Sequence, residues 1–385
     1  MSATVDLLRR KFRAKFGGEA RVYRAPGRVN LIGEYTDFND GFVMPAAIGR
    51  TCWVAAAPRA DRKLVIHSEN YSDTFAWDFA AGEPARTGRW SDYPAGVAVM
   101  LARSGAELRG ANLMIHGEVP IGAGLSSSAA IDVAAGYALL DTAGLAVDGL
   151  QLARVSQRAE NEFVGARCGI MDQFASVFGR AGKAIVLDCR SLGYELAPIP
   201  DSVHLVICNT MVKHANSSGE YNLRRAQCEE AVARLAVFYP GVKALRDVTI
   251  EQLERRRGDL PDVIYRRAAH VVAEDARVLA AVRELGAGDL GAFGRRMAES
   301  HESLRTLFEV SSPELDLMVE LANRQEGVLG ARMTGGGFGG STINLVEAGR
   351  EKSFRQNMAR AYEEATGRHA DIQMCDPADG AGRVD

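Results

Sequence analysis

Residues 119–136, "VPIGAGLSSSAAIDVAAG", contain the change from a strand to a helix around which the rest of the chain is organised. Pro120 ends an apolar, β-like run, and the small residues Gly122, Ala123 and Gly124 separate it from three consecutive serines. Serine is a favoured helix N-cap, and the free N–H groups of a first helical turn attract anions. Glycines ahead of that turn let the backbone wrap closely around a phosphate. The segment therefore predicts a phosphate-binding loop that leads into a buried, alanine-rich helix.

This segment differs from two common nucleotide-binding fingerprints. No Gly-Lys-Ser/Thr follows the glycines, as it would in a Walker A loop, and the glycines do not form GxGxxG after a Rossmann strand. Taken alone, the segment also fits a capped core helix with a tight entry turn. Three serines in a row before a buried helix favour the anion site over this simpler interpretation.

Two further segments carry candidate chemistry. Residues 333–346, "MTGGGFGGSTINLV", place five glycines around Phe338 ahead of a strand, which lets one backbone approach another backbone or a ligand closely. A glycine-rich hairpin at a packed interface is the simpler interpretation. Residues 166–179, "ARCGIMDQFASVFG", place Asp172 among apolar neighbours. There it is either a helix cap or a functional carboxylate held away from solvent.

A fourth segment, residues 24–41, "RAPGRVNLIGEYTDFNDG", combines many charges with the apolar run "VNLI". It continues directly into "FVMPAAI" at 42–48. A surface loop has no need of the apolar run, and a buried strand does not tolerate so many charges. The segment thus places a polar cluster against the core, an arrangement that fits neither a surface loop nor a buried strand.

Composition limits the class of protein. A chain of 385 residues favours two domains. The net charge of −3, without basic clusters, excludes an electrostatic footprint for nucleic acid or a membrane surface. The six cysteines form no CxxC pair, and the seven histidines form no metal-binding spacing, which predicts reduced thiols and no dedicated metal cage. Residues 1–18 look like an amphipathic helix without a cleavage site, so we expect a cytoplasmic protein.

The order of patterns along the chain predicts a mixed α+β architecture. Segments rich in Val, Ile, Thr and aromatic residues dominate residues 20–120; a long helical pattern follows "SSSAA" at 126–130, and another covers 150–165. After residue 200 a strand at 204–210 precedes three long helical patterns, at 220–239, 265–285 and 292–308. A strand at 339–346, a helix at 351–367 and a strand at 370–375 close the chain. We expect two closely packed halves with a boundary near residue 200.

The motifs acquire a common meaning when they are taken together. The segments "APGRVNLIGEYTD", "PIGAGLSSSAA" and "MTGGGFGGS" resemble the three sequence motifs of the GHMP small-molecule kinases, in the same order and spacing. With "NDGFVMPAAI" attached, the first resembles the galactokinase signature within that family, and "CGIMDQ", "SGEYNLRRAQCEEA" and "DPADGAG" are also galactokinase-like. The resemblance runs from Val22 to about Gly382.

This resemblance implies a two-lobed α+β fold with the active site between the lobes. The N-terminal lobe, residues 1–200, would be ribosomal-S5-like and would hold the sugar signature and the phosphate loop. The C-terminal lobe, residues 201–385, would be ferredoxin-like and would hold the glycine-rich motif at 333–341. The implied reaction is ATP-dependent phosphorylation of D-galactose at its C1 hydroxyl, with Mg²⁺, by a monomer or weak homo-oligomer.

The resemblance assigns roles on the sugar side. Arg28 and Asp172 match the arginine and the proposed base at the reacting centre. Glu34, Tyr35 and Asp37 match positions that contact the sugar, and carboxylates suit this task because ionised acceptors form strong hydrogen bonds with hydroxyls. Further sugar contacts are implied for the backbone of Gly169 and the ring of Tyr221.

On the nucleotide side, the loop and the metal pair are assigned in the same way. The residues implied to cradle the ATP phosphates are Gly122, Gly124, Ser126, Ser127 and Ser128. Ser128 and Glu160 match the pair associated with Mg²⁺, a cation that usually keeps several of its waters. Trp90 and Tyr93 match aromatics near the adenine, although aromatic residues are more often part of a core.

The chain departs from the galactokinase pattern at Tyr35, where histidine is typical. Three interpretations stay open: the hydroxyl takes over the histidine's hydrogen bond, the pocket prefers a modified or smaller sugar, or Tyr35 faces away from the sugar. The alternative functions are a kinase for N-acetylgalactosamine or arabinose and a non-catalytic sensor of galactose and ATP. The complete "GLSSSAA" loop together with Arg28 and Asp172 favours the enzyme.

Overall fold

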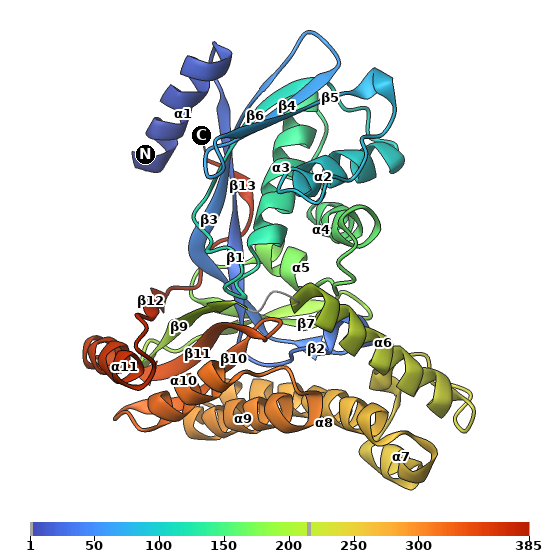
Figure 1. Cartoon of the computed structure of the whole chain (residues 1–385), viewed down its shortest axis with the longest axis vertical. Coiled ribbons are helices and arrows are strands. Elements are labelled where there is room, and N and C mark those ends of the chain that lie inside the picture. Colours follow the sequence, from blue (N-terminus) through green and yellow to red (C-terminus); the bar gives the residue numbers. More distant parts are fainter. Residues whose placement is uncertain (1–2, 214–216, 385) are drawn as a thin grey trace.

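The computed structural model describes residues 3–213 and 217–384. Figure 1 shows two lobes, one above the other, joined at a narrower waist. The upper lobe contains most of the N-terminal half of the chain, and the lower lobe contains most of the C-terminal half. A mixed α+β fold with two lobes is therefore confirmed. The division at residue 200 stays a prediction.

A twisted sheet forms the centre of the upper lobe. Within the described residues it has six strands in the order β13-β1-β3-β6-β4-β5. The strands are β1 (Arg21–Asn30), β3 (Pro45–Pro58), β4 (Lys63–Ser68), β5 (Asp73–Asp78), β6 (Ala111–Gly117) and β13 (Gly382–Arg383). The helices and short turns are α1 (Ala3–Phe16), η1 (Asp37–Asn39), η2 (Phe79–Ala81), α2 (Asp92–Arg103), α3 (Ser127–Ala143), α4 (Gly149–Arg158), η3 (Ala159–Val164) and α5 (Met171–Phe178).

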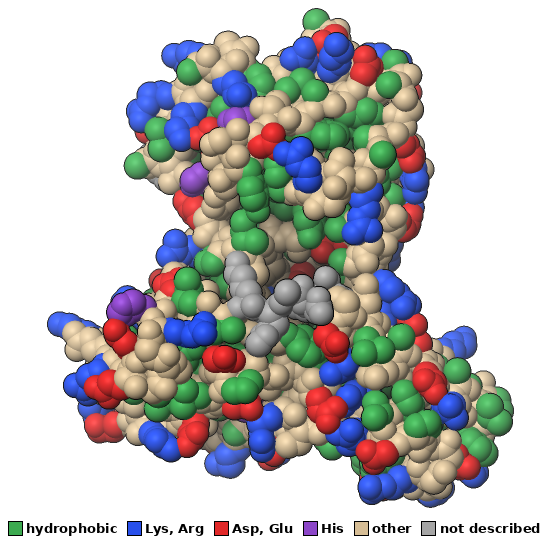
Figure 2. All heavy atoms as spheres, viewed as in Figure 1, with side chains coloured by type: hydrophobic (Ala, Val, Ile, Leu, Met, Phe, Trp, Pro, Cys, Tyr) green, Lys and Arg blue, Asp and Glu red, His purple; other side chains and the backbone are tan. Residues whose placement is uncertain are grey.

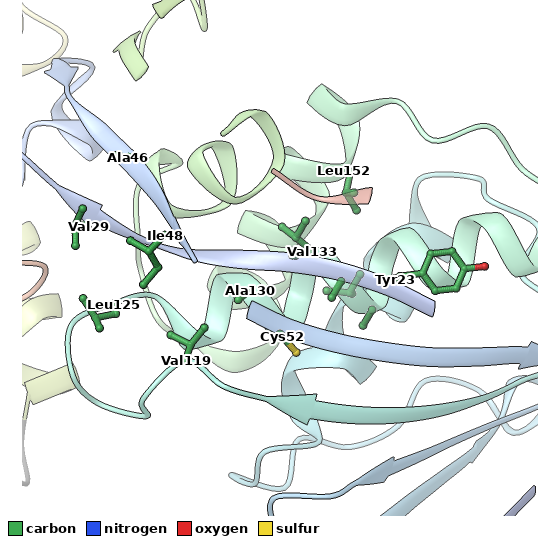
Figure 3. Packing of buried hydrophobic residues seen from close by; sticks show 14 of the residues in the cluster. Tyr23, Val29, Ala46, Ile48, Cys52, Val119, Leu125, Ala130, Val133 and Leu152 are labelled. Carbon is green, nitrogen blue, oxygen red and sulfur yellow. The ribbon is translucent and has the colours of Figure 1, made fainter. Parts of the chain in front are cut away.

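Successive residues of a strand in this sheet point to opposite faces, and each face is covered by helices. On β1, Val22 packs with Phe12 of α1, whereas the next residue, Tyr23, belongs to the main core beneath α3. This is the period of two that a strand with both faces covered requires. Figure 3 shows Val133 of α3 against the strands, with Val119 and Leu125 pointing into the same core. Because these two residues flank the predicted phosphate loop, the core fixes both ends of that loop.

A second sheet and a layer of helices form the lower lobe. Its described strands lie in the order β10-β11-β9-β12, namely β9 (Val203–Lys213), β10 (Val328–Thr334), β11 (Gly339–Glu347) and β12 (Asp371–Cys375). The helices are α6 (Ser217–Ala236), η4 (Leu245–Asp247), α7 (Ile250–Arg255), η5 (Arg257–Asp259), α8 (Asp262–Gly286), α9 (Leu290–Ser303), η6 (Leu304–Phe308), α10 (Pro313–Asn323) and α11 (Glu351–Thr366). Figure 1 shows α8 and α9 side by side beneath this sheet.

Two connections cross between the lobes. The small sheet β2-β7-β8 joins β2 (Phe42–Val43), at the end of the signature loop (residues 31–42), to β7 (Lys183–Asp188) and β8 (Tyr194–Pro198). At the other end of the chain, β13 returns to the upper lobe and pairs with β1 through Tyr23 and Arg383. The lobes are thus tied together by strand pairing as well as by the continuous chain.

The sequence patterns locate most of these elements, with some corrections. The helical pattern at 150–165 is α-helical only to Arg158 and continues as the π-helical segment η3. The pattern at 292–308 ends likewise in the π-helical segment η6. The prediction omitted α2, α5, α7, α10, β7, β8, β10 and β13. Of the predicted helix at 1–18, residues 1 and 2 lie outside the described part. Among the residues described, no helix is long and apolar enough to cross a membrane.

Candidate active site

The structure brings Arg28 and Asp172 together at the centre of the molecule. Arg28 follows an irregularity in β1, is only 4% exposed, and donates two hydrogen bonds to Asp172. The Nε of Arg28 lies 2.8 Å from Oδ1 of Asp172, and its Nη2 lies 2.9 Å from Oδ2. Such a two-point pair fixes both side chains in orientation as well as in position. The carboxylate is therefore bound to Arg28 and does not cap α5, which removes the simpler interpretation of Asp172.

Ser126 is a correction to the sequence analysis. It stands at the N-cap position of α3 but has left-handed backbone angles (φ 60°, ψ 49°), and its side chain caps no N–H group. The hydroxyl donates instead to Asp172. The first turn of α3 thus has no capping side chain, which keeps its N–H groups available for an anion.

The glycine-rich hairpin between β10 and β11 packs directly on the predicted phosphate loop, the segment that precedes α3. A Cβ atom on Gly335 would lie 2.5 Å from the carbonyl oxygen of Gly124, and one on Gly124 would lie 2.9 Å from that of Thr334. Ser341 donates a hydrogen bond of 2.8 Å to the carbonyl of Ala123. Glycine is required here because two backbones approach without room for a side chain. The two glycine motifs and the Arg28–Asp172 pair therefore form one contiguous site, since Arg28 also donates to the Gly124 carbonyl at 2.6 Å.

A cavity of about 900 Å³ opens beside the phosphate loop, with walls from both lobes. Its lining includes Ser127, Ser128, Trp90, Tyr93 and Met211. Trp90 stacks on Tyr71, with ring centroids 6.1 Å apart and ring planes within 8° of parallel, and its indole N–H donates to Asp73 at 2.9 Å. Figure 2 shows the hollow between the two lobes, with hydrophobic side chains on its upper wall. The cavity joins an aromatic wall to the N-terminus of α3.

Glu160 lies on the π-helical segment η3 and is buried close to Asp172. Its carboxylate accepts hydrogen bonds from Ser128 and from Gln173, the latter at 2.9 Å. Burial, and then the negative charge of Asp172, raise the pKa of Glu160 to about 7. Asp132 on α3 is fully buried against Glu160, and burial raises its pKa as well. Two buried carboxyl groups therefore lie together beside Asp172, whose own charge is paired with Arg28.

This arrangement fits Mg²⁺ in donor type. One hydroxyl and one carboxylate suit a cation that takes its remaining ligands from water and phosphate. The excess of buried carboxylates is what a divalent cation would offset. In the described part of the chain, no group of three or more His, Cys, Asp or Glu side chains could hold a metal by itself. His214 lies outside that part.

Glu34 is buried in a set of hydrogen bonds that spans the chain. Its Oε1 accepts from the N–H of Gly335 at 2.9 Å, and its Oε2 accepts from Asn30 at 2.8 Å. Oε2 also lies 2.5 Å from the guanidinium of Arg332, which is fully buried. Burial raises the pKa of Glu34, although Arg332 and the Gly335 N–H oppose the shift. The carboxylate is thus oriented by groups from β10 and the glycine-rich hairpin.

Asp37 and Gly169 touch each other next to the Arg28–Asp172 pair. A Cβ on Gly169 would lie 2.0 Å from Oδ2 of Asp37, so only glycine leaves room for that carboxylate. Burial, and then the charge of Asp172, raise the pKa of Asp37 to about 6. A partly desolvated carboxylate in this position has unused acceptor capacity for a hydroxyl-rich ligand.

Tyr35 points into an aromatic cluster. Its ring packs against Phe308 at 4.5 Å and Tyr221 at 5.3 Å between centroids, and its hydroxyl donates to the carbonyl of Gly336. Its backbone is left-handed (φ 69°), an uncommon conformation for a tyrosine. Because the hydroxyl of Tyr35 already donates its hydrogen to the carbonyl of Gly336, its oxygen can only accept a further hydrogen bond. Tyr35 therefore links the signature loop to the glycine-rich hairpin.

Sequence reasoning missed several residues of this site. Arg332 carries a signal, because it is a single charge within the apolar run before the glycine motif. His270, Glu274 and Asp275 of α8 contact the signature loop, and no local pattern predicts which helix lies beneath that loop. The thiols agree with expectation: all six are free, and all but Cys168 are buried.

Comparison with known proteins identifies relatives of the chain. Residues 10–58 match the model of the galactokinase galactose-binding signature. Residues 92–180 and 279–364 match the N-terminal and C-terminal domains of GHMP kinases. A galactokinase from Roseiflexus sp. (strain RS-1) is 46% identical over 98% of this chain and 96% of its own length. A galactokinase from Chloroflexus aurantiacus is 45% identical over 94% of this chain and 93% of its own length.

Solved structures agree with these sequence relatives. The crystal structure of galactokinase from Lactococcus lactis, complexed with galactose, has a TM-score of 0.96 to this chain at 37% identity. The match covers 99% of this chain and all of the other. The mevalonate kinase of Methanococcus jannaschii has a TM-score of 0.64 at 18% identity, over 94% of this chain and 99% of its own. This more distant likeness shows the shared fold alone.

Proposed function

Because the chain belongs to the galactokinase family of GHMP kinases, we propose that it transfers the γ-phosphoryl group of ATP to the C1 hydroxyl of D-galactose. The products are galactose 1-phosphate and ADP, and the reaction is the first committed step of galactose breakdown. The Arg28–Asp172 pair, placed against the phosphate loop, is the observation that carries the proposal. The near-full-length relatives named galactokinase support the choice of sugar.

Arg28 and Asp172 have different roles in the transfer of the phosphoryl group. The sugar C1 oxygen forms a bond to phosphorus while the bond to the bridging oxygen of ADP breaks. Asp172 orients the hydroxyl and takes its proton late, because a loose transition state needs little base assistance. Arg28 offsets the charge on the moving phosphoryl group. Ser126 helps to hold the carboxylate in the reactive orientation.

The phosphate loop holds the nucleotide. Gly122, Gly124, Ser126, Ser127 and Ser128 surround the phosphates at the uncapped N-terminus of α3. Trp90 and Tyr93 line the wall that receives the adenine.

Ser128 and Glu160 hold Mg²⁺ when it is bound, and the ion supplies charge neutralisation for the phosphate oxygens. The buried, free thiols and the lack of basic clusters suit a cytoplasmic enzyme without nucleic-acid or membrane partners. It acts as a monomer or a weak homo-oligomer.

The sugar lies between the two lobes. Asp37 and Glu34 accept hydrogen bonds from its hydroxyls, while Gly169 provides a backbone contact and Tyr221 a ring. Tyr35 acts as an acceptor only, since its own hydrogen bonds Gly336. This combines two of the interpretations left open by the sequence: the ring is turned into the aromatic cluster, and its oxygen still serves the sugar.

The decisive experiment measures ADP release from Mg·ATP with galactose, 2-deoxygalactose, galactosamine, N-acetylgalactosamine, arabinose, glucose and fucose. We expect fast turnover on galactose by the wild type, little changed in Tyr35→His. Faster turnover on another of these sugars moves the assignment to that sugar. Galactose binding without ADP release from any sugar identifies a sensor and contradicts the proposal.

Two variants test the roles of the catalytic pair. We expect Asp172→Asn and Arg28→Ala each to lower kcat about 100-fold or more, because each removes a group that acts in the transition state. Wild-type turnover by Asp172→Asn contradicts the role of the carboxylate, and wild-type turnover by Arg28→Ala contradicts that of the arginine.

A further inference from the structure

The signature loop, residues 31–42, belongs to the N-terminal half of the sequence, yet helix α8 of the lower lobe holds its backbone. The N–H of Gly33 donates to Glu274 Oε1 at 3.0 Å. At the far end of the loop, the N–H of Phe42 donates to Asp275 Oδ1 at 2.7 Å. Between them, His270 Nε2 lies 3.2 Å from the carbonyl oxygen of Glu34.

His270 and Glu274 lie four positions apart on one face of α8, and Asp275 follows directly, about 100° further around the helix. Nothing separates them from the loop. A Cβ on Gly41 would lie 2.3 Å from Asp275 Oδ1, and one on Gly33 would lie 2.9 Å from a methyl group of Val278. The loop backbone therefore rests directly on the helix, and Figure 1 shows α8 below β2, where the loop ends.

The α8 groups are themselves held in place. Glu274 is fully buried and also accepts from Ser300 at 2.5 Å and from Arg277 at 2.7 Å. His270 is fully buried, and because a carbonyl only accepts, its Nε2 must carry the hydrogen. Its Nδ1 then accepts from the hydroxyl of Ser303 at 2.8 Å. The contacts of Glu274 and His270 with the loop thus have a defined direction and a second support.

We propose that His270, Glu274 and Asp275 are positioning residues that set the backbone of the signature loop and thereby the affinity for the sugar. They reach the sugar only through Glu34, Tyr35 and Asp37, the ligands that the loop carries. In this respect the inference rests on the proposed function. The nucleotide side is built from α3, η3 and the cavity wall, so these α8 residues control sugar binding separately from ATP binding.

Asp275 offers the sharpest test, because its side chain is only partly buried. Asp275→Ala removes the acceptor for the Phe42 N–H, whereas Asp275→Asn keeps an acceptor oxygen in the same place. We expect the KM for the sugar to rise about 10-fold in Asp275→Ala, with the KM for ATP unchanged. In Asp275→Asn we expect a sugar KM within about 2-fold of wild type.

Glu284→Ala is the matched control. Glu284 lies on the same helix and accepts from Arg296 at 3.1 Å, on the neighbouring helix α9. We expect Glu284→Ala to leave both KM values unchanged. The inference is overturned by an unchanged sugar KM in Asp275→Ala, by a parallel rise in the KM for ATP, or by equal damage from Asp275→Asn.

Ser303→Ala covers the case in which Asp275→Ala does not fold. It removes the support of His270 Nδ1, and we expect a several-fold rise of the sugar KM alone; an unchanged sugar KM contradicts the inference. Calorimetric binding of galactose without nucleotide separates the two proposals. Wild-type binding without turnover contradicts the proposed function, while weaker binding by Asp275→Ala still supports the role of α8. Should another sugar be the substrate, that sugar is used in the same comparison.

Discussion

Asp37 accepts a hydrogen bond from the N–H of Phe38 at 2.9 Å and lies against Gly169. Burial and the charge of Asp172 raise its pKa to about 6, so the fold disfavours its ionised form. In the unfolded chain the pKa returns to about 3.9. Between these values the folded protein binds more protons than the unfolded chain, so this residue makes stability fall as pH rises through the window. The proposed role of Asp37 as an ionised acceptor at neutral pH therefore lowers the stability of the folded protein.

We therefore expect Asp37→Asn to stabilise the unliganded protein and to weaken sugar binding. At pH 7.5 the Tm should exceed that of wild type by about 2 °C or more, and the difference should vanish near pH 4. The KM for galactose should rise about 10-fold or more, because an acceptor is lost. Thermal melts and kinetics across this pH range check both effects. Asp262→Asn, at an exposed carboxylate, serves as the control, and a lower Tm for Asp37→Asn at pH 7.5 contradicts the expectation.

At the scale of elements, the β10–β11 hairpin and the loop before α3 act as one unit. Their backbones meet at Gly335 and Gly124, and Ser341 bonds the carbonyl of Ala123. The hairpin thus supports the phosphate loop from the lower lobe. The glycines serve backbone contact, in agreement with one of the two uses that the glycine run suggests.

Gly335→Ala tests this unit against a matched glycine. Gly335 and Gly367 both have left-handed backbone angles (φ 79° and 70°), but a Cβ on Gly367 meets nothing within 4 Å. Gly367→Ala should cost about 1 kcal/mol of stability and leave kinetics normal. Gly335→Ala should cost more and raise the KM for ATP about 10-fold, because the phosphate loop must shift. Denaturant unfolding measures the loss of stability, and steady-state kinetics measure the KM for ATP. Equal effects of the two substitutions contradict the idea that the backbone at Gly335 supports the loop before α3.

At the scale of the whole molecule, a buried ion pair joins distant parts of the chain. Glu34 of the signature loop and Arg332 of β10 lie 2.5 Å apart, and Arg332 also donates to the carbonyl of Asn30 at 3.2 Å. Near the C-terminus, β13 pairs with β1 and so joins the end of the chain to the upper lobe. These long-range contacts set how the signature loop faces the glycine-rich hairpin.

Removing one partner of this pair leaves a buried charge without compensation. We expect Arg332→Met to lower the free energy of unfolding by about 3–5 kcal/mol, and the added change Glu34→Gln to recover part of that loss. Galactose binding should stay impaired in the double variant, because the oriented carboxylate is gone. Urea unfolding of the single and double variants measures the interaction free energy between Glu34 and Arg332. If the two losses of unfolding free energy simply add, the two residues do not stabilise each other and the expectation is contradicted.

Much of the fold and part of the site follow from local patterns. Segments rich in Val, Ile, Thr and aromatic residues predict β1 and β3, and the Gly-Ser segment predicts the loop before α3. The helical patterns predict α8, α9 and α11. Motif resemblance adds Arg28 and Asp172, which the structure pairs. The pattern at 150–165 does not predict the π-helical segment that carries Glu160, because the residues of both kinds of helix have similar local preferences.

The sequence by itself determined the class of fold and the family, and it predicted a phosphate loop, since glycine conformation, strand and helix periods and ordered motifs are properties of short segments. Only the tertiary structure decided that Ser126 bonds Asp172 instead of capping its helix, that Arg332 pairs with Glu34, and that α8 holds the signature loop. These contacts join residues from 46 to 298 positions apart in the chain (172 − 126 and 332 − 34). Local preference cannot specify such pairs, because they form only when packing brings separate elements into hydrogen-bonding distance.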